Sequence, residues 1–176
     1  KLIEIYKNKN LINDYNNYKY LIYLHHYTKK NLTCKSSAKY LLKKINTNKN
    51  KKPKILMINN NLLKNKDSVN YSQNLISIGL RNVLGENFID YPKNDILYEN
   101  YVGKEGYGKG FTYSKVLKDI IVDRTNIKKK IYNKEYDFII YGLMGKDEKD
   151  VGDIRINCPL WNEVSSKYNK NEIIFI

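Results

Sequence analysis

The stretch GKEGYGKG, residues 103–110, has the spacing in this sequence that most resembles a chemical motif. Gly103, Gly108 and Lys109 match the G-x-x-x-x-G-K part of a P-loop, in which backbone N–H groups and a lysine surround nucleotide phosphates. The next position of a P-loop carries a hydroxyl that binds Mg²⁺. Here that position is Gly110, and Thr112 lies two residues further on. The sequence therefore disfavours a true P-loop.

Two interpretations of this stretch stay open. Gly106, Gly108 and Lys109 could contact a phosphate-bearing ligand through backbone N–H groups and the lysine ammonium, without forming a P-loop. Alternatively, the glycines only allow positive φ angles and tight turns in a surface loop. The preceding segment, ILYENYV, has Glu99 and Asn100 in its middle, unlike the buried strand that comes before a P-loop. Gly106, Gly108 and Lys109 are kept as candidate ligand-binding residues.

The first predicted strand, residues 54–59, runs into the polar triplet Asn59-Asn60-Asn61. Ligands of open α/β sheets bind beyond the carboxyl ends of the strands, so Asn59 and Asn60 are candidate contacts. The glycines of a dinucleotide-binding fold or a typical methyltransferase are missing from this position. A phospho-receiver domain would need a carboxylate pair here, which is also missing. The triplet therefore disfavours three common functions of this architecture.

Two further candidates lie at the ends of later predicted strands. Asp90 lies in the segment FIDY, one residue before its end, where it is either a ligand contact or a turn residue before Pro92. Gly142 follows YDFIIY, where it either admits a ligand close to the backbone or relieves crowding within the sheet.

Several kinds of site are disfavoured by the residues that are missing. The two histidines, His25 and His26, both precede the predicted α/β region, which weakens any imidazole-based mechanism there. Cys34 and Cys158 have no Cys or His nearby at ligand spacing, so we predict no metal site. The remaining acid–base candidates are carboxylates, and no catalytic residue is assigned. Two thiols far apart favour a reducing compartment, and we expect a cytoplasmic protein.

The net charge of +14 invites a nucleic-acid interpretation. However, 29 of the 32 basic residues are Lys, and Arg is the residue that favours bidentate contacts with phosphates and bases. Lys, Asn, Ile and Tyr together make up 93 of the 176 residues, a bias that A/T-rich codons produce without selection for a partner. We therefore expect no specific nucleic-acid partner. No apolar run reaches the ~18 residues of a membrane span.

The apolar periodicity divides the chain into three parts. Residues 1–46 are predicted to be helical, with Tyr20, Leu21, Leu24 and Tyr27 at helical spacing in a first helix. A second helix is expected from a cap at Ser36 or Ser37, as the end of a preceding domain or repeat. Residues 47–53 are predicted to be a linker. Residues 54–176 are predicted to be a Rossmann-like α/β domain, cut short at its carboxyl end.

Residues 54–176 alternate strand and helix signals, which is typical of an open parallel sheet with helices on both faces. The predicted elements, in chain order, are strand 54–59, helix 68–84 ending at Gly85, strand 88–91, a helix capped by Thr112, a helix capped by Asn126, strand 136–144, a helix starting at Pro159 and strand 172–176. The apolar face of the Thr112-capped helix would consist of Val116, Leu117, Ile120 and Ile121. The stripe of the last helix would consist of Trp161, Val164 and Tyr168.

The order of short phrases from residue 54 onward carries a family resemblance. KILMINN, GLRNVLG, FIDYPK, YGKGFTY, DRTNI and YDFIIYG, followed by a final strand, resemble the amino-terminal half of GT-B-like, spore-maturation-type glycosyltransferases. The resemblance implies an acceptor-side half that holds a saccharide or glycan. It implies that a nucleotide sugar would bind mainly outside this chain, so no cofactor is expected within it. No family catalytic residue matches a position here.

Two alternatives to a glycosyltransferase-like domain remain. One is a non-catalytic α/β interaction module whose basic helical arm binds an acidic partner. The other is a nucleotide-binding enzyme that uses the Gly103–Gly110 loop.

Overall fold

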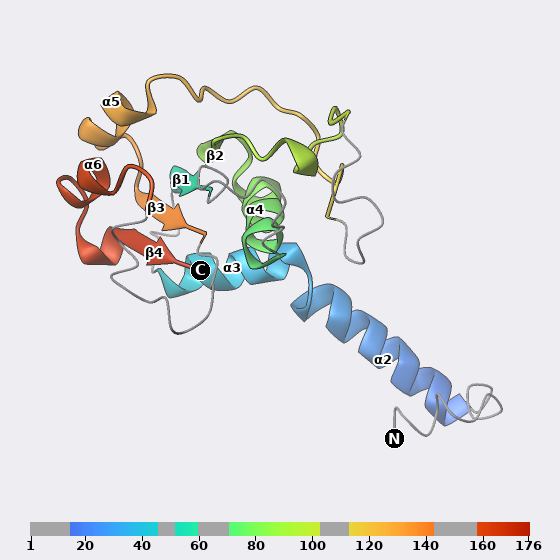
Figure 1. Cartoon of the computed structure of the whole chain (residues 1–176). Coiled ribbons are helices and arrows are strands. Elements are labelled where there is room, and N and C mark those ends of the chain that lie inside the picture. The colour runs from blue at the N-terminus through green and yellow to red at the C-terminus, as the bar shows by residue number, and fades with distance from the viewer. Residues whose placement is uncertain (1–14, 46–51, 60–70, 103–112, 143–157) are drawn as a thin grey trace, which may run out of the picture.

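The computed structural model of the chain describes residues 15–45, 52–59, 71–102, 113–142 and 158–176, with side chains from residue 18 onward (Figure 1). The α-helices are α2 (Tyr15–Asn31), α3 (Cys34–Lys44), α4 (Tyr71–Leu84), α5 (Ile127–Tyr132) and α6 (Trp161–Ser165). The strands are β1 (Ile55–Ile58), β2 (Phe88–Tyr91), β3 (Phe138–Tyr141) and β4 (Ile173–Phe175). Short 3₁₀ turns are η3 (Gly85–Asn87), η4 (Asp95–Leu97) and η7 (Lys170–Glu172).

The strands form one four-stranded sheet in the order β2-β1-β3-β4, and every neighbouring pair is parallel. All four residues of β1 are buried, as expected for a strand covered on both faces. The predicted α/β class and open parallel sheet are therefore confirmed. Strand β1 pairs with β3 as well as with β2, and β3 also pairs with β4.

Helices cover both faces of the sheet (Figure 1). Successive residues of each strand point to opposite faces. The core layer between the sheet and helices α3 and α4 consists of Ala38, Leu42, Ile55, Met57, Leu80, Leu84, Phe88 and Ile140. The core layer on the other face, between the sheet and helices α5 and α6, includes Leu56, Ile58, Ile89, Ile127, Ile131, Ile139, Tyr141 and Val164. Neighbouring residues of one strand thus belong to different layers, and the same alternation fixes the direction of the polar residues at the strand ends.

Helix α3 packs against the core of the α/β body through Ala38 and Leu42. The predicted cap at Ser36 or Ser37 is wrong. Thr33 is the N-cap, because its Oγ1 accepts from Ser36 N at 3.1 Å while Ser36 Oγ accepts from Thr33 N at 2.8 Å. The helix packs closely on α4 at Gly79, where a Cβ would lie 2.0 Å from the Cys34 carbonyl oxygen. Only a glycine permits this approach of the two backbones.

Helix α4 ends as the sequence predicts. Gly85 follows its last residue at φ 62°, the left-handed conformation that commonly stops a helix. The predicted start of this helix at residue 68 lies outside the described residues, in which α4 begins at Tyr71. The last helix, α6, begins at Trp161 and not at Pro159, because Leu160 adopts φ 59° immediately before it.

The predicted helix with Val116, Leu117, Ile120 and Ile121 on its apolar face is wrong. Residues 113–126 form no helix, and the expected cap Thr112 lies outside the described residues. Leu117 N donates to Leu97 O at 2.9 Å, and Leu117 O accepts from Glu99 N at 2.9 Å. The backbone N–H and C=O of Leu117 therefore bond to the segment around Leu97 and not to residues one helical turn away.

Candidate ligand site at the carboxyl edge of the sheet

The strand order places the expected ligand crevice between β1 and β3. The chain passes from β1 to β2 on one side and then returns to add β3 on the other side, so the order reverses at β1. Ligands of open α/β sheets bind at this reversal, beyond the carboxyl ends of the strands. The register pairs Ile58 with Tyr141, which sets Asn59 and Gly142 side by side at this point.

Asn59 has an uncommon environment for a polar side chain. It is fully buried, and the strand alternation directs it to the same face as α4. Its Nδ2 donates to the Pro92 carbonyl oxygen at 2.5 Å. Its Oδ1 has no hydrogen-bond partner among the described residues. A buried acceptor without a partner costs about 1–3 kcal/mol, so it marks a place where an outside donor would bind favourably.

The next side chain at this edge is Gln73, in the first turn of α4. It is buried and lies over the carboxyl end of β3, because a Cβ at Gly142 would be 2.1 Å from its Oε1. Gly142 therefore makes room for a side chain from the neighbouring helix. This finding agrees with the crowding interpretation of Gly142.

A second amide pair lies further along the same edge. Asn94, which follows β2, donates from Nδ2 to Asn74 Oδ1 on α4 at 2.8 Å, and both side chains are buried. With Asn59 and Gln73, they give four buried amides on the α4 side of the carboxyl edge, a group we call the amide row (Asn59, Gln73, Asn74 and Asn94). An amide both donates and accepts, so the row is suited to neutral groups that do the same.

Asp90 is the acceptor at the centre of a buried ion-pair cluster. Its Oδ1 accepts from Arg81 Nη2 at 3.2 Å, from Arg124 Nη2 at 2.5 Å and from the Tyr98 hydroxyl at 2.9 Å. Its Oδ2 accepts from Asn94 N at 3.0 Å. Both oxygens of the carboxylate are thus bound by groups of the chain itself.

The cluster of Arg81, Asp90, Tyr98 and Arg124 connects distant parts of the chain. Arg124 also donates from Nε to the Asp90 carbonyl oxygen at 2.9 Å, which fixes the extended segment before α5 to β2. Burial, with Asp90 beside the ring, raises the pKa of Tyr98 to about 12, so its hydroxyl stays a donor. A buried charge in such a cluster is costly to leave unpaired, so each partner depends on the others.

An aromatic group occupies the carboxyl ends of β3 and β4, on the α6 side. Tyr141 and Phe175 stack with ring centroids 5.6 Å apart, and Trp161 lies 6.1 Å from each. The Tyr141 hydroxyl donates to Pro159 O at 3.0 Å, and burial raises its pKa. Phe175 is 40% exposed, so part of this aromatic group faces solvent.

The candidate residues predicted from sequence divide into two sets. Asn59, Asp90 and Gly142 all lie on the α4 side of neighbouring strands at the carboxyl edge. Asn60, Gly106, Gly108 and Lys109 lie outside the described residues. Whether any of the seven binds a ligand stays a prediction.

Sequence reasoning missed the partners that α4 contributes. The helix buries Gln73, Asn74, Ser77 and Arg81 beside Ile78, Leu80 and Leu84, whereas Ile76 and Val83 are only partly buried. Gln73, Ser77 and Leu80 follow one another at helical spacing, so polar side chains lie on the stripe that packs against the sheet. A polar residue that interrupts an apolar stripe in this way is the signal that could have pointed to the site.

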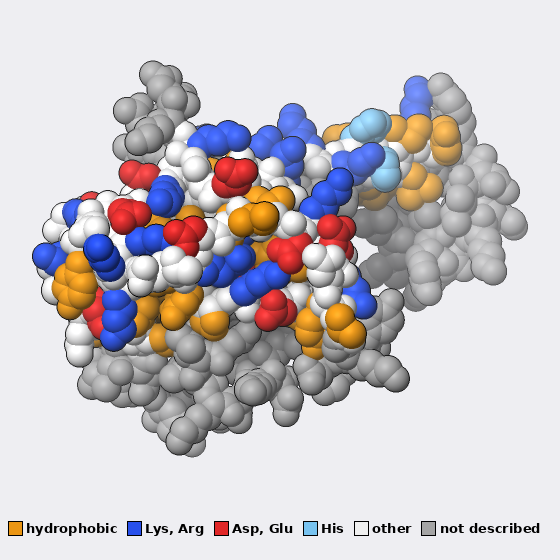
Figure 2. Space-filling view, turned by 90° about the horizontal axis from the view of Figure 1, so that it is seen from above, with side chains coloured by type: hydrophobic (Ala, Val, Ile, Leu, Met, Phe, Trp, Pro, Cys, Tyr) orange, Lys and Arg blue, Asp and Glu red, His pale blue; other side chains and the backbone are white. Residues whose placement is uncertain are grey.

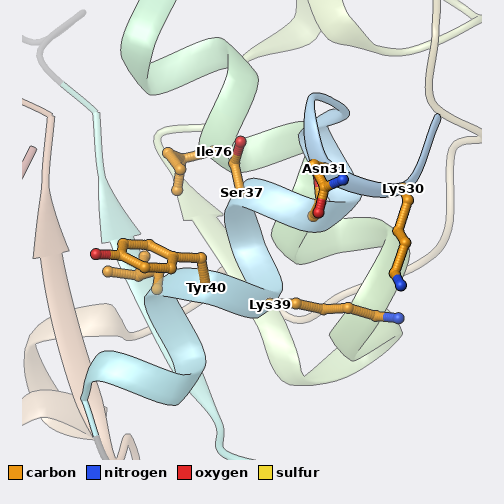
Figure 3. Close-up of a pocket in the computed structure, with 8 residues that line it drawn as sticks. Lys30, Asn31, Ser37, Lys39, Tyr40 and Ile76 are labelled. Carbon is orange, nitrogen blue, oxygen red and sulfur yellow. The ribbon is translucent and has the colours of Figure 1, made fainter. Parts of the chain in front are cut away.

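A groove of about 530 Å³ lies elsewhere, where the end of α2 meets α3 (Figure 3). Its polar lining includes Lys30, Asn31, Ser37 and Lys39, and none of the predicted site residues borders it. We place the candidate ligand site at the carboxyl edge, because the strand reversal and the buried acceptor coincide there.

The described residues contain no group of three His, Cys, Asp or Glu side chains that could hold a metal ion. No helix within the described ranges combines the length and the apolar character needed to cross a bilayer. The fold and edge define the class of an open parallel α/β domain. No family model, curated protein or solved structure matches this chain.

Proposed function

We propose that the carboxyl edge of the sheet binds a saccharide acceptor, within a glycosyltransferase-like domain. The observation that carries this proposal is the buried Asn59 Oδ1, which has no hydrogen-bond partner among the described residues and lies at the strand reversal. A sugar hydroxyl donates to such an oxygen and can accept from a neighbouring amide in the same row.

Charge supports a neutral ligand at this edge. Among the described residues, Arg81 and Arg124 are the arginines that connect to the amide row, through Asp90 and the Asn94 backbone, and both are bound to Asp90. A phosphate or carboxylate ligand would need a cation that is not already paired. Hydroxyl groups need none, so the amide row suits a polyol better than an anion.

The aromatic group supports a sugar ring in particular. Trp161 and the partly exposed Phe175 lie at the same edge of the sheet, on its other face. Binding sites for small molecules combine aromatic walls with a few placed polar groups, and this edge offers both. In this proposal a nucleotide-sugar donor binds mainly outside the chain. The reduced thiols of Cys34 and Cys158 support a cytoplasmic setting.

Ligand-observed NMR with a panel of neutral oligosaccharides tests the proposal on the whole chain. Asn59→Ala should remove the saturation-transfer signal of any sugar that the unchanged protein binds, because the buried acceptor is removed. Asn87→Ala is the matched control, since Asn87 also donates to a backbone carbonyl, Lys52 O at 3.1 Å, but precedes β2 at the opposite edge.

Thermal unfolding checks that the Asn59 variant is folded at the measuring temperature. If it is not, Gln73→Ala provides a second alteration of the same edge. No signal from any saccharide with the unchanged protein would exclude the proposal, as would full binding by both edge variants.

A further inference from the structure

The two amino-terminal helices carry positive charge without any acidic residue. Residues 15–45 hold seven lysines and no Asp or Glu. The lysines are Lys19, Lys29, Lys30, Lys35, Lys39, Lys43 and Lys44. We call residues 18–45 the arm. Its positive charge is not balanced by carboxylates of its own, which leaves it attractive to a polyanion.

Helix α2 extends away from the body (Figure 1). None of its described side chains is buried. Figure 2 shows apolar, basic and histidine side chains together over this helix, whereas basic and acidic groups are mixed on the body. Four tyrosines of the arm, Tyr18, Tyr23, Tyr27 and Tyr40, are between 45% and 63% exposed. Aromatic rings and lysines are thus both exposed on the arm.

We propose that the arm binds single-stranded nucleic acid without sequence preference, a function beyond the proposed saccharide site. Proteins that bind single strands in this way combine lysines along the backbone with exposed rings on which bases stack. Tyr23 and Tyr27, one helical turn apart, have ring centroids 6.2 Å apart and form two neighbouring platforms. Lys29 and Lys30 follow them in the last turn of α2.

The groove between α2 and α3 provides an anchor for one nucleotide of the strand. The side chains of Lys30 and Lys39, from different helices, end on the same side of the groove in Figure 3, and no carboxylate of the described residues pairs with either. Tyr40 extends to the other side, with Lys44 Nζ 5.4 Å from its ring centroid. A phosphate between the two lysines and a base against Tyr40 would use both sides of the groove.

The composition of the arm argues against other polyanions. An amphipathic helix on a membrane needs one apolar and one polar face, but apolar residues of α2 point in every direction around its axis. Lysine lacks the planar fork with which arginine makes bidentate contacts, so the arm is poorly suited to sequence-specific reading of a duplex. An acidic peptide would satisfy the lysines but would leave four exposed rings without a stacking partner.

Fluorescence anisotropy of a labelled, mixed-sequence single-stranded RNA of about 12 nucleotides tests the proposal on the whole chain. Replacing Tyr23 and Tyr27 together by Ala should weaken binding about tenfold or more, because the bases can no longer stack there. The matched Phe replacements keep the rings and should bind as the unchanged protein does. These side chains are exposed, and circular dichroism checks that α2 remains helical.

The salt dependence provides a separate readout for the lysines. Replacing Lys30 and Lys39 by Ala should lower the slope of log affinity against log salt by about 0.7 for each phosphate that the protein no longer neutralises. Lys170→Ala, on the body, should leave that slope unchanged. Equal binding by the Ala and Phe variants would overturn the proposal. So would binding to polyglutamate, duplex DNA or anionic vesicles that is as tight as binding to the single strand.

Discussion

The α/β body and the arm use charge in opposite ways. In the body, the Asp90 carboxylate binds Arg81 and Arg124. Other lysines of the body form surface ion pairs, such as Lys93–Asp119 and Lys134–Glu172. In the arm, seven lysines have no acidic residue within residues 15–45. The chain has three arginines, and two of them meet at one buried carboxylate.

The difference shows that the overall charge of this chain describes neither region. A planar guanidinium can serve several acceptors at fixed angles, which a buried network requires. A lysine ammonium on a flexible stem is suited to an exposed surface and a mobile polyanion. The net charge of +14 is therefore informative only once it is assigned to regions.

Asp90→Asn, which alters the paired charges of the body, should cause the largest loss of stability. It leaves the buried Arg81 and the partly buried Arg124 without a counter-charge, and removing one member of a buried ion pair typically costs about 3–5 kcal/mol. Denaturant unfolding measures the loss. Glu172→Gln, which removes a surface partner of Lys134, is the control and should cost less than about 1 kcal/mol. Similar losses for the two variants would contradict a special role for the buried cluster.

Gly79→Ala should weaken the packing of α3 on α4 and cause an intermediate loss of stability. The added methyl group would meet the Cys34 carbonyl oxygen and the Ala38 side chain, so α3 must move away from α4. Overpacking of this kind costs about 1–3 kcal/mol, again measured by denaturant unfolding. Asn82→Ala, at an exposed position of α4, should not destabilise the chain, because Ala favours helix. Unchanged stability of the Gly79 variant would show that α3 does not need this close packing.

Tyr98→Phe should have the smallest effect, about 1 kcal/mol for a missing hydrogen bond. Its pH dependence is more specific. Burial and Asp90 raise the pKa of Tyr98 from 10.0 to about 12, so its contribution is complete below pH 10 and is lost as pH rises toward about 12. The stability gap between the unchanged protein and the variant should therefore narrow over that range. A gap that stays constant in denaturant titrations at each pH would contradict this, and Tyr18→Phe on α2 is the control.

The sheet could be predicted from sequence because its strands are short apolar runs with clear ends. Ile55–Ile58 and Phe138–Tyr141 are apolar throughout, and a run of this length fits a strand buried on both faces. The segment around Leu117 could not be predicted in the same way. Its apolar spacing suits a helix, but this preference is overridden by hydrogen bonds with the backbone of Leu97 and Glu99, which lie far from it in the chain.

The candidate site was predictable only where it coincides with strand ends. Asn59 and Gly142 were found because parallel strands bring their carboxyl ends to one edge. The approach of Arg81 and Arg124 to Asp90 depends on how α4 and the segment before α5 cross the sheet. Residue spacing does not encode those crossings, so the ion-pair cluster could not be inferred from it.

The strand order has a consequence for the growing polypeptide. Residues 55–58 and 88–91 emerge early and can pair, but the other side of the first strand receives its neighbour only when residues 138–141 have been made. During synthesis of the intervening stretch, a wholly apolar strand offers an open row of backbone groups to any other nascent chain. Protection over that interval, for example by a chaperone, would decide the yield of correctly assembled molecules.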